Sequence, residues 1–417
     1  MDQAIRINKY LPIAILYFFF NGFLLPRGLL YTAILTPLIL LWVIKYPSIK
    51  YVWIFILAYI AFAAIHIMNG VDYYYYLKST LLIISVFIFS LAFYEFLNQS
   101  SSIRIIYKYI VVLNIFFVFI ALMALFSTRL SARFWYNNNI TEGISSLKRL
   151  KMLTYEPSYY SFLMVPLALY YYLKMIILKL SNARLYFLMI TIPLLLSLSF
   201  GVLMGLTLSL VLTLLIGSKR FFSNSNFLIY FLIALIIVIT LLIIGALFFP
   251  DNVIFLRISN VFAGKDTSFR GRTFDSFYLG TEIAREKSIL FGVGPGQVKV
   301  LGLDNFIKFY NNTDFKIEQV GIPNAVGDTL ATFGILGVLI RFGLEIYFFF
   351  STKVLSNYYR LSLFLFVFIY QFTGSFLNNI AEYVIWLLAF HPGMFEEFDK
   401  SEFGIKKKVR GYRTSEI

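Results

Sequence analysis

Long apolar runs recur along almost the whole chain and constrain its fold more than any other feature. A helix needs about 20 apolar residues to cross the roughly 30 Å of hydrocarbon in a bilayer. Runs that approach this length fall near residues 11–26, 28–44, 51–68, 79–97, 105–127, 156–173, 185–198, 201–217, 227–249, 326–348, 361–376 and 379–393. Because 60% of the 417 residues are hydrophobic, the sequence predicts an all-α polytopic integral membrane protein with about twelve transmembrane helices.

Two apolar stretches, 185–217 and 361–395, are each too long for a single crossing of ordinary tilt. We expect each to fold into a hairpin, with breaks at 199–201 and 375–379. The chain then divides into four parts: helices one to nine in residues 1–249, a large periplasmic loop in 250–325, helices ten to twelve in 326–395, and a basic tail in 396–417.

Positive charge predicts the orientation, because cytoplasmic segments of membrane proteins carry an excess of lysine and arginine. The short outer turns hold only Arg27 and Lys78. With the N-terminus inside, each cytoplasmic segment before the KKKVRGYR tail is basic: Arg6, Lys9, Lys45, Lys50, Arg104, Lys108, Lys174, Lys179, Arg184, Lys219, Arg220, Lys353 and Arg360. Both termini are therefore predicted to be cytoplasmic.

Two outer loops depart from this charge pattern. The loop at 128–152 contains a single acid, Glu142, and five basic residues: Arg129, Arg133, Lys148, Arg149 and Lys151. A loop this short is subject to the rule against outer positive charge, so another function must retain these residues. The loop at 250–325 concentrates Arg257, Lys265, Arg270 and Arg272 in its first part. Structureless connections of this length are uncommon, so we expect a small, partly helical cap.

Composition excludes several other functions. The net charge is +15, but the basic residues lie between apolar runs, as topology signals do, so no nucleic-acid partner is expected. The chain has no cysteine, which excludes disulfides and thiol catalysis. Its only histidines, His66 and His391, are far apart in sequence. We therefore expect neither a metal centre nor another cofactor.

The long loop contains an amphipathic segment, GRTFDSFYLGTEIAREK, which is typical of a helix that starts near Thr273. Thr273 is suited to the N-cap. One predicted face holds Phe274, Phe277, Tyr278 and Ala284, and the other holds Asp275, Glu282 and Glu286, as in a helix that lies on a membrane surface.

Arg270 and Arg272 come just before this helix. Free backbone N–H groups and guanidinium forks at such a position favour phosphate oxygens, and the flanking phenylalanines would hold the arginines at headgroup level. The alternative is that both are solvated arginines that touch ordinary anionic headgroups. The FGVGPG segment at 291–296 follows the helix, and its glycines favour a plain tight turn over a phosphate-binding nest.

The segment LTYEPSYYS opens the predicted span at 156–173. Pro157 suits the first helical position, so Glu156 is either a simple acid at the positive end of the helix or a general base at the outer mouth. Tyr155 and Tyr159 could stack on sugar rings, although an interfacial aromatic belt also explains tyrosines.

The segment IPNAVGDTLATFGILGVLI enters the predicted span at 326–348. Asn324 and Asp328 are four residues apart and share a helix face near the outer boundary, where polar groups are usually paired or functional. Arg341 lies deeper in the span. It snorkels, pairs with Glu345, or faces the interior of the bundle.

These features together resemble the Wzy-type O-antigen and exopolysaccharide repeat-unit polymerases, whose wider superfamily includes the O-antigen ligases. The resemblance extends from 105 to 395 and rests on four motifs: EPS at the start of a span, an arginine-led aromatic helix, GVGPG in a large outer loop, and N-x-x-x-D-T-L-x-x-F-G-I-L-G at the start of the next span. Ligases typically have a histidine before that asparagine, where this chain has Pro323, and many relatives read Ser-Arg-Gly where it has SFG at 199–201. The first difference favours a polymerase over a ligase.

The resemblance implies a metal-independent glycosyltransferase of the bacterial inner membrane with its active site facing the periplasm. Such an enzyme transfers a growing glycan from undecaprenyl pyrophosphate to a sugar hydroxyl of the next lipid-linked repeat. Arg270 and Arg272 would then bind the donor pyrophosphate, Glu156 would be the base, and the basic cluster Arg129, Arg133, Lys148 and Arg149 would bind the second substrate. Tyr155, Tyr159, Asn324 and Asp328 are further predicted substrate contacts. A chain-length regulator and a flippase are the protein partners implied.

Three other functions remain open from the sequence. An O-antigen ligase shares the donor chemistry but uses a different acceptor. A lipid-linked sugar transferase of another class usually needs an acidic pair in the first outer loop, and the loop at 21–28 contains no acid. A flippase or secondary transporter would show matched halves and polar sites at the midplane, whereas the charge of this chain gathers in two outer loops.

Overall fold

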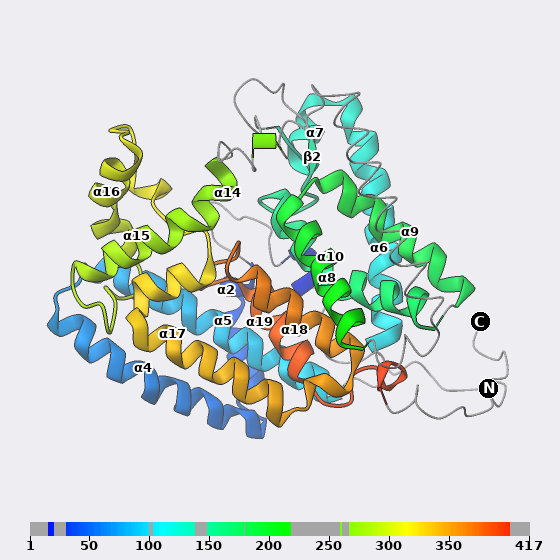
Figure 1. The fold of residues 1–417 in the computed structure, drawn as a ribbon, viewed down its shortest axis with the longest axis horizontal. Coiled ribbons are helices and arrows are strands. Elements are labelled where there is room, and N and C mark those ends of the chain that lie inside the picture. The colour runs from blue at the N-terminus through cyan, green and yellow to red at the C-terminus, as the bar shows by residue number, and fades with distance from the viewer. Residues whose placement is uncertain are drawn as a thin grey trace.

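The computed structural model describes residues 16–20, 31–99, 103–137, 148–178, 180–217, 259–260 and 267–400, which form a mainly helical protein (Figure 1). Several predicted features lie outside these residues: most of the first span at 11–26, the span at 227–249, the loop tip with Glu142 and the tail beyond Lys400. The same holds for the basic residues Arg6, Lys9, Arg27, Lys179, Lys219, Arg220, Arg257 and Lys265.

The described helices follow most of the predicted apolar runs. In chain order they are the π-helical turn Leu16–Phe20, α2 (Tyr31–Ile34), α3 (Thr36–Val43), α4 (Lys50–Met68), α5 (Tyr73–Gln99), α6 (Ile103–Met123), α7 (Thr128–Phe134), α8 (Pro157–Ile176), α9 (Ser181–Ser197), α10 (Phe200–Ile216), α14 (Thr267–Arg272), α15 (Phe274–Arg285), α16 (Gln297–Tyr310), α17 (Ala325–Ser351), α18 (Tyr358–Tyr370) and α19 (Ile380–Phe390).

Among the residues that the structure describes, four helical stretches are long and apolar enough to cross a membrane: Pro47–Met68, Tyr73–Asn98, Ile103–Phe126 and Ala325–Ser351. Large apolar side chains on all four are exposed, such as Leu57 on α4, Phe116 on α6 and Leu339 on α17, as expected of helices whose solvent is lipid. Shorter apolar helices occur at Ala183–Ser197, Phe200–Ile216, Tyr358–Tyr370 and Ile380–Phe390. The described part of the chain is thus largely helical, and several of its helices have the length and apolar composition of membrane spans. The count of about twelve spans stays a prediction.

Helices α18 and α19 are shorter than the predicted spans at 361–376 and 379–393. The first has 13 residues and the second 11, so each rises about 20 Å or less. Helix α19 ends at Phe390 because Pro392 follows and the residue before it, His391, has extended backbone. Helix α18 ends at Tyr370 because the chain leaves helical geometry in the connection between the two helices, residues 371–379. The predicted break at 375–379 falls within it. The other predicted break is confirmed as well, because α9 ends at Ser197 and α10 begins at Phe200, with Leu198 in the left-handed region at φ 48°.

Helix α8 lies at the centre of the main apolar core. All of its residues from Pro157 to Leu173 are buried, and it packs against α9, α10, α18 and α19. The core also includes the inner faces of α5 and α6. Because α8 is enclosed on all sides, both of its ends are fixed in space, and its first residues provide a rigid base for a site.

The predicted helical cap in the long loop is confirmed for residues 267–310, which form α14, α15 and α16 above the start of α17 (Figure 1). A second, smaller apolar core holds this cap together and includes Leu279, Ile283, Val298 and Phe306. Helix α15 packs along α17, and Gly280 allows the approach, because a Cβ there would lie 2.8 Å from the Gly327 carbonyl oxygen.

The 291–296 turn is a backbone junction between the cap and a kink in α17. Gly334 has φ 67° and interrupts the helix, which exposes the carbonyl groups of the turn before it. Val293 N–H donates to Ala331 O at 2.9 Å, and Gly294 N–H donates to Thr332 O at 2.9 Å. These donors are consumed within the protein, so the plain-turn interpretation accounts for the segment better than a phosphate nest does.

The basic loop departs slightly from the all-α expectation. After α7, residues Trp135–Tyr136 form strand β1, which pairs antiparallel with β2 (Arg149–Leu150). The Trp135 indole N–H also donates to Ala121 O at 2.7 Å, which ties the hairpin to the end of α6.

Candidate active site

The EPS motif forms the start of α8 as predicted. Pro157 is at the first helical turn, and Glu156 is the N-cap residue with extended backbone at φ −146° and ψ 155°. Its side chain makes no capping hydrogen bond. The carboxylate is therefore not committed to holding the helix end, which leaves it available for another task.

Arg270 and Arg272 lie in the short helix α14, and Thr273 alone separates its end from the start of α15. Thr273 is the N-cap residue of α15, as predicted, but its hydroxyl does not cap that helix; it donates to Phe269 O at 2.9 Å. The hydroxyl bonds to α14 instead because the Phe269 carbonyl group lies one helical turn before it. The two arginines consequently stand on one helical turn rather than on free loop backbone.

The two arginines have different environments. Arg270 Nε lies 3.1 Å from Asp275 Oδ1 in an ion pair. The other carboxylate oxygen of Asp275 accepts from the Tyr310 hydroxyl at 3.2 Å, and burial together with Asp275 raises the pKa of Tyr310 to about 12. Arg270 thus connects α14 with α15 and α16, and its guanidinium is directed to the cap.

The predicted placement of Asp275 on the exposed polar face of α15 is wrong. Its side chain is buried, while Phe274 and Tyr278, which were placed together on the apolar face, are exposed. The reason is that α15 packs on α17 through Leu279, Gly280 and Ile283. The ion pair with the largely exposed Arg270 and the hydrogen bond from Tyr310 satisfy the buried Asp275 carboxylate, so a polar residue can occupy the packed face.

Arg272 lies in the wall of a cavity of about 220 Å³ between α14, the start of α8, and the 371–379 connection. Three other predicted site residues share this cavity: Glu156, Tyr155 and Tyr159. Its remaining lining residues are Ser158, Phe162, Pro323, Tyr370, Ser375, Phe376 and Asn379. The structure therefore joins one cation, one carboxylate and a group of aromatic rings from parts of the chain that are far apart in sequence.

Tyr155 has the most informative environment in this cavity. Its hydroxyl is buried and has no hydrogen-bond partner among the residues that the structure describes. Burial, and then the neighbouring Glu156 carboxylate, raise the pKa of Tyr155 well above its usual value, with Arg272 opposing the shift. The hydroxyl therefore stays neutral, and a buried polar group without a partner is costly unless a ligand or water satisfies it.

Asn324 holds Arg272 in place instead of facing the cavity. Its side-chain oxygen caps α17 by accepting from Gly327 N–H at 2.6 Å. Its amide nitrogen donates to Arg272 O at 2.9 Å and to Phe372 O at 3.2 Å. Asn324 thus links the backbone of Arg272 to the 371–379 connection. Asp328 stabilises the same connection, because its Oδ2 accepts from Leu377 N–H at 2.9 Å.

The predicted basic cluster lies apart from the cavity. Arg129 and Arg133 are exposed on α7, Lys148 is exposed before β2, and none of the three lines the cavity. Arg149 Nε donates to Ser197 O at 3.0 Å, at the break between α9 and α10. A role for this cluster in binding a second substrate remains a prediction.

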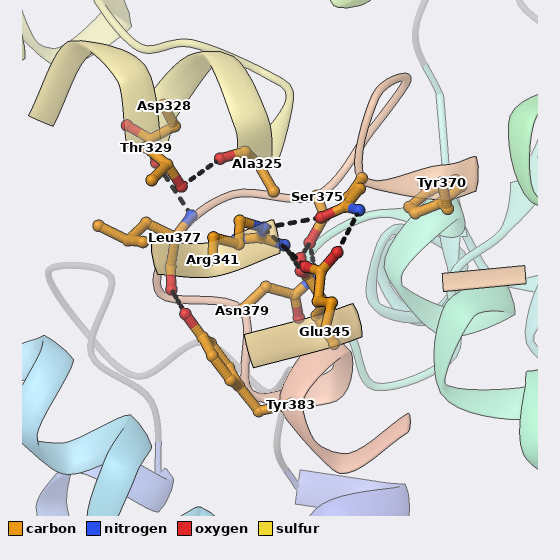
Figure 2. A network of polar contacts seen from close by, with 12 residues as sticks. Ala325, Asp328, Thr329, Arg341, Glu345, Tyr370, Ser375, Leu377, Asn379 and Tyr383 are labelled. Carbon is orange, nitrogen blue, oxygen red and sulfur yellow. Dashed lines mark hydrogen bonds and ion pairs between the residues drawn. The ribbon is translucent and has the colours of Figure 1, made fainter. Parts of the chain in front are cut away.

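A buried charged network, which the sequence only partly indicated, adjoins the cavity (Figure 2). Arg341 pairs with Glu345 at 3.2 Å, one of the three arrangements expected for it. It also pairs with Glu382 on α19 and donates to Gln371 Oε1 at 2.7 Å. Glu382 in turn accepts from Ser375, which lines the cavity. The isolated acid Glu382 in an apolar run was the available signal for this network, and the sequence analysis missed it.

Among the described residues, no three His, Asp or Glu side chains are grouped so that they could hold a metal ion. A scan against protein-family models and a search of curated proteins found no match for this chain. The candidate site therefore rests on its own geometry, which offers a cation for an anionic group, a carboxylate for a proton and tyrosines for polar, ring-bearing ligands.

Proposed function

We propose that the protein is a polymerase of lipid-linked oligosaccharide repeats, which transfers a glycan from a polyprenyl pyrophosphate carrier to a sugar hydroxyl of another lipid-linked repeat. The observation that carries the proposal is the shared cavity of Arg272, Glu156, Tyr155 and Tyr159. Each of these residues was expected in such a site from the sequence, and the cavity joins residues of α8 with a residue of the distant outer loop.

In this reaction the protein has to stabilise the charge of the leaving pyrophosphate, position the acceptor hydroxyl and accept its proton. The bond between the anomeric carbon and the pyrophosphate oxygen breaks, and its electron pair leaves with the pyrophosphate. A new bond forms from the acceptor oxygen to the anomeric carbon, and the hydroxyl proton goes to Glu156. Arg272 stabilises the charge that grows on the departing pyrophosphate. Each group needed for this balance is present in the cavity wall.

The positions of the helix ends support a site at the outer surface. The cavity lies where α8 and α19 begin, where α18 ends, and beside Pro323 just before α17. The charge pattern assigns all of these ends to the periplasmic side. A lipid-linked sugar would present its pyrophosphate at this level while its polyprenyl chain remains in the hydrocarbon.

The two arginines take separate roles in this proposal. Arg272 contacts the donor pyrophosphate, whereas Arg270, which the sequence analysis paired with it, holds α14 through Asp275. The exposed basic residues of α7 attract the second anionic lipid substrate from the membrane surface.

Deletion of the gene in its host, followed by gel analysis of surface glycan and lipid-linked intermediates, tests the proposal. Loss of the ladder with a single capped repeat remaining is the expected result. Long chains that accumulate on the carrier lipid would instead identify a ligase, and repeats trapped on the cytoplasmic face would identify a flippase. Either of these two results would overturn the polymerase.

A further inference from the structure

The 371–379 connection between α18 and α19 forms a second polar wall of the cavity through Ser375 and Asn379. Ser375 has φ 67°, in the left-handed region that residues other than glycine rarely adopt. Glycine would accept this backbone without strain, so a serine there points to a requirement for its side chain.

The hydrogen bonds of the Ser375 hydroxyl determine what it can still bind. It donates its proton to Glu382 Oε2 and accepts from Asn379 Nδ2 at 2.8 Å. The orientation of the Asn379 amide is fixed, because its oxygen accepts from Ala381 N–H at 3.0 Å at the start of α19. A hydroxyl has one donor and two acceptor positions, so the remaining capacity of Ser375 is that of an acceptor.

The network behind Ser375 keeps its proton directed away from the cavity. The other oxygen of Glu382 accepts from Arg341 Nη2. Arg341 is held by Glu345 and by Gln371, whose own amide nitrogen donates to Glu345 Oε2 at 2.9 Å. Both oxygens of Glu382 therefore already accept a hydrogen bond. Of Glu382, Arg341, Glu345, Gln371 and Ser375, it is Ser375 that lines the cavity, and its remaining acceptor position is available there.

This wall discriminates between the two kinds of group on the substrate. A phosphate oxygen has no proton to give to Ser375. A sugar hydroxyl can donate. Arg272 has the opposite character and favours the phosphate. The two polar walls thus divide the cavity into an anion side and a hydroxyl-donor side.

We propose that Ser375, oriented by Glu382 and Asn379, binds the acceptor sugar by accepting a hydrogen bond from one of its hydroxyl groups. This inference rests on the proposed function. Ser375 makes no covalent bond and carries no proton to solution; it fixes the acceptor hydroxyl in the cavity while Glu156 takes the proton. Glu382 acts through Ser375 and is a positioning residue.

The test separates the acceptor from the donor. The purified full-length protein is given the lipid-linked repeat as donor and the same repeat on a short alkyl chain as acceptor. Because the alkyl compound lacks pyrophosphate, it can accept a glycan but cannot donate one. The test variant is Ser375→Gly, which removes the hydroxyl and suits the left-handed backbone. Ser375→Ala, which keeps a Cβ, is the second variant.

For Ser375→Gly we expect an unfolding temperature close to that of the wild type, because relief of the left-handed strain offsets the lost hydrogen bonds to Glu382 and Asn379. We expect a KM for the alkyl acceptor about tenfold higher, with the donor KM within twofold. Glu382→Gln should also raise the acceptor KM more than the donor KM. An unchanged acceptor KM in both Ser375 variants would overturn the inference alone. Failure of the wild type to transfer any glycan would overturn the inference together with the proposed function.

Discussion

Arg272 and Arg360 stand at opposite ends of the same helices and have opposite environments. Arg360 is buried where α17 and α19 end, and its donors are used by backbone carbonyls: Nε donates to Ala389 O at 2.9 Å and Nη2 to Thr352 O at 2.7 Å. Arg272 lies in a cavity wall near the residues where α17 and α19 begin. The comparison teaches that the surroundings of a guanidinium, carbonyl groups in one case and a polar cavity in the other, separate an arginine that closes helix ends from one that can bind a ligand.

Replacement of Arg272 by alanine should give the largest effect on activity. Loss of the guanidinium removes charge stabilisation from the leaving pyrophosphate, so we expect polymer synthesis to fall by about 10³-fold. Arg270→Ala is the matched control, since its guanidinium is paired with Asp275, and it should lose less than about tenfold. The turnover of both variants is measured with lipid-linked repeats. A greater loss of turnover in Arg270→Ala than in Arg272→Ala would assign the pyrophosphate contact to Arg270 instead.

Glu156→Gln should have the next largest effect. The amide cannot accept the hydroxyl proton, so kcat should fall by about 10²-fold while the unfolding temperature stays close to that of the wild type, because the carboxylate makes no capping bond. Glu286, an exposed acid after α15, provides the control variant Glu286→Gln. Full activity in Glu156→Gln would remove Glu156 from the mechanism.

At the other ends of α17 and α19, Arg360→Met should lower the free energy of unfolding instead of turnover. It removes charged donors from the carbonyls that end α17 and α19, which should cost about 2 kcal/mol or more. Arg104→Met is the control: its partner is Glu397, but its side chain is 61% exposed, so its loss should cost little. Thermal unfolding in detergent measures both. A catalytic defect per folded molecule in Arg360→Met would contradict this contrast between the two ends.

Tyr155→Phe sharpens the comparison within the Arg272 cavity itself. The hydroxyl has no partner in the described residues, so its removal should leave stability unchanged or slightly higher, while loss of a ligand contact raises KM by about tenfold. Tyr160→Phe is the control on the next turn. Its hydroxyl donates to Asn114 Oδ1 at 3.0 Å inside the protein, so that variant should lose about 1 kcal/mol of stability without a change in KM.

Periodicity and charge predicted the helices and the outer cap, because apolar runs and cap residues are local signals. They also identified Glu156 and Arg272, each from its position next to a helix end. Periodicity and charge could not predict that these two residues share one cavity, because that depends on how α14 packs beside α8. The same limit explains Asp275 and Glu382. A helical pattern shows which residues share a face, but the partner helix decides whether that face is buried.

The smallest effect is expected from Arg129→Ala combined with Arg133→Ala on α7. Both side chains are exposed and neither lines the cavity, so they act on substrate approach through long-range attraction, which salt screens. We expect a loss of less than about fivefold in kcat/KM at 0.15 M salt, and none at 1 M. Lys45→Ala with Lys50→Ala, exposed residues that the charge pattern assigns to the cytoplasmic side, should change nothing at either salt concentration. A defect of the α7 double variant that persists at 1 M salt would show a direct contact and extend the substrate site beyond the Arg272 cavity.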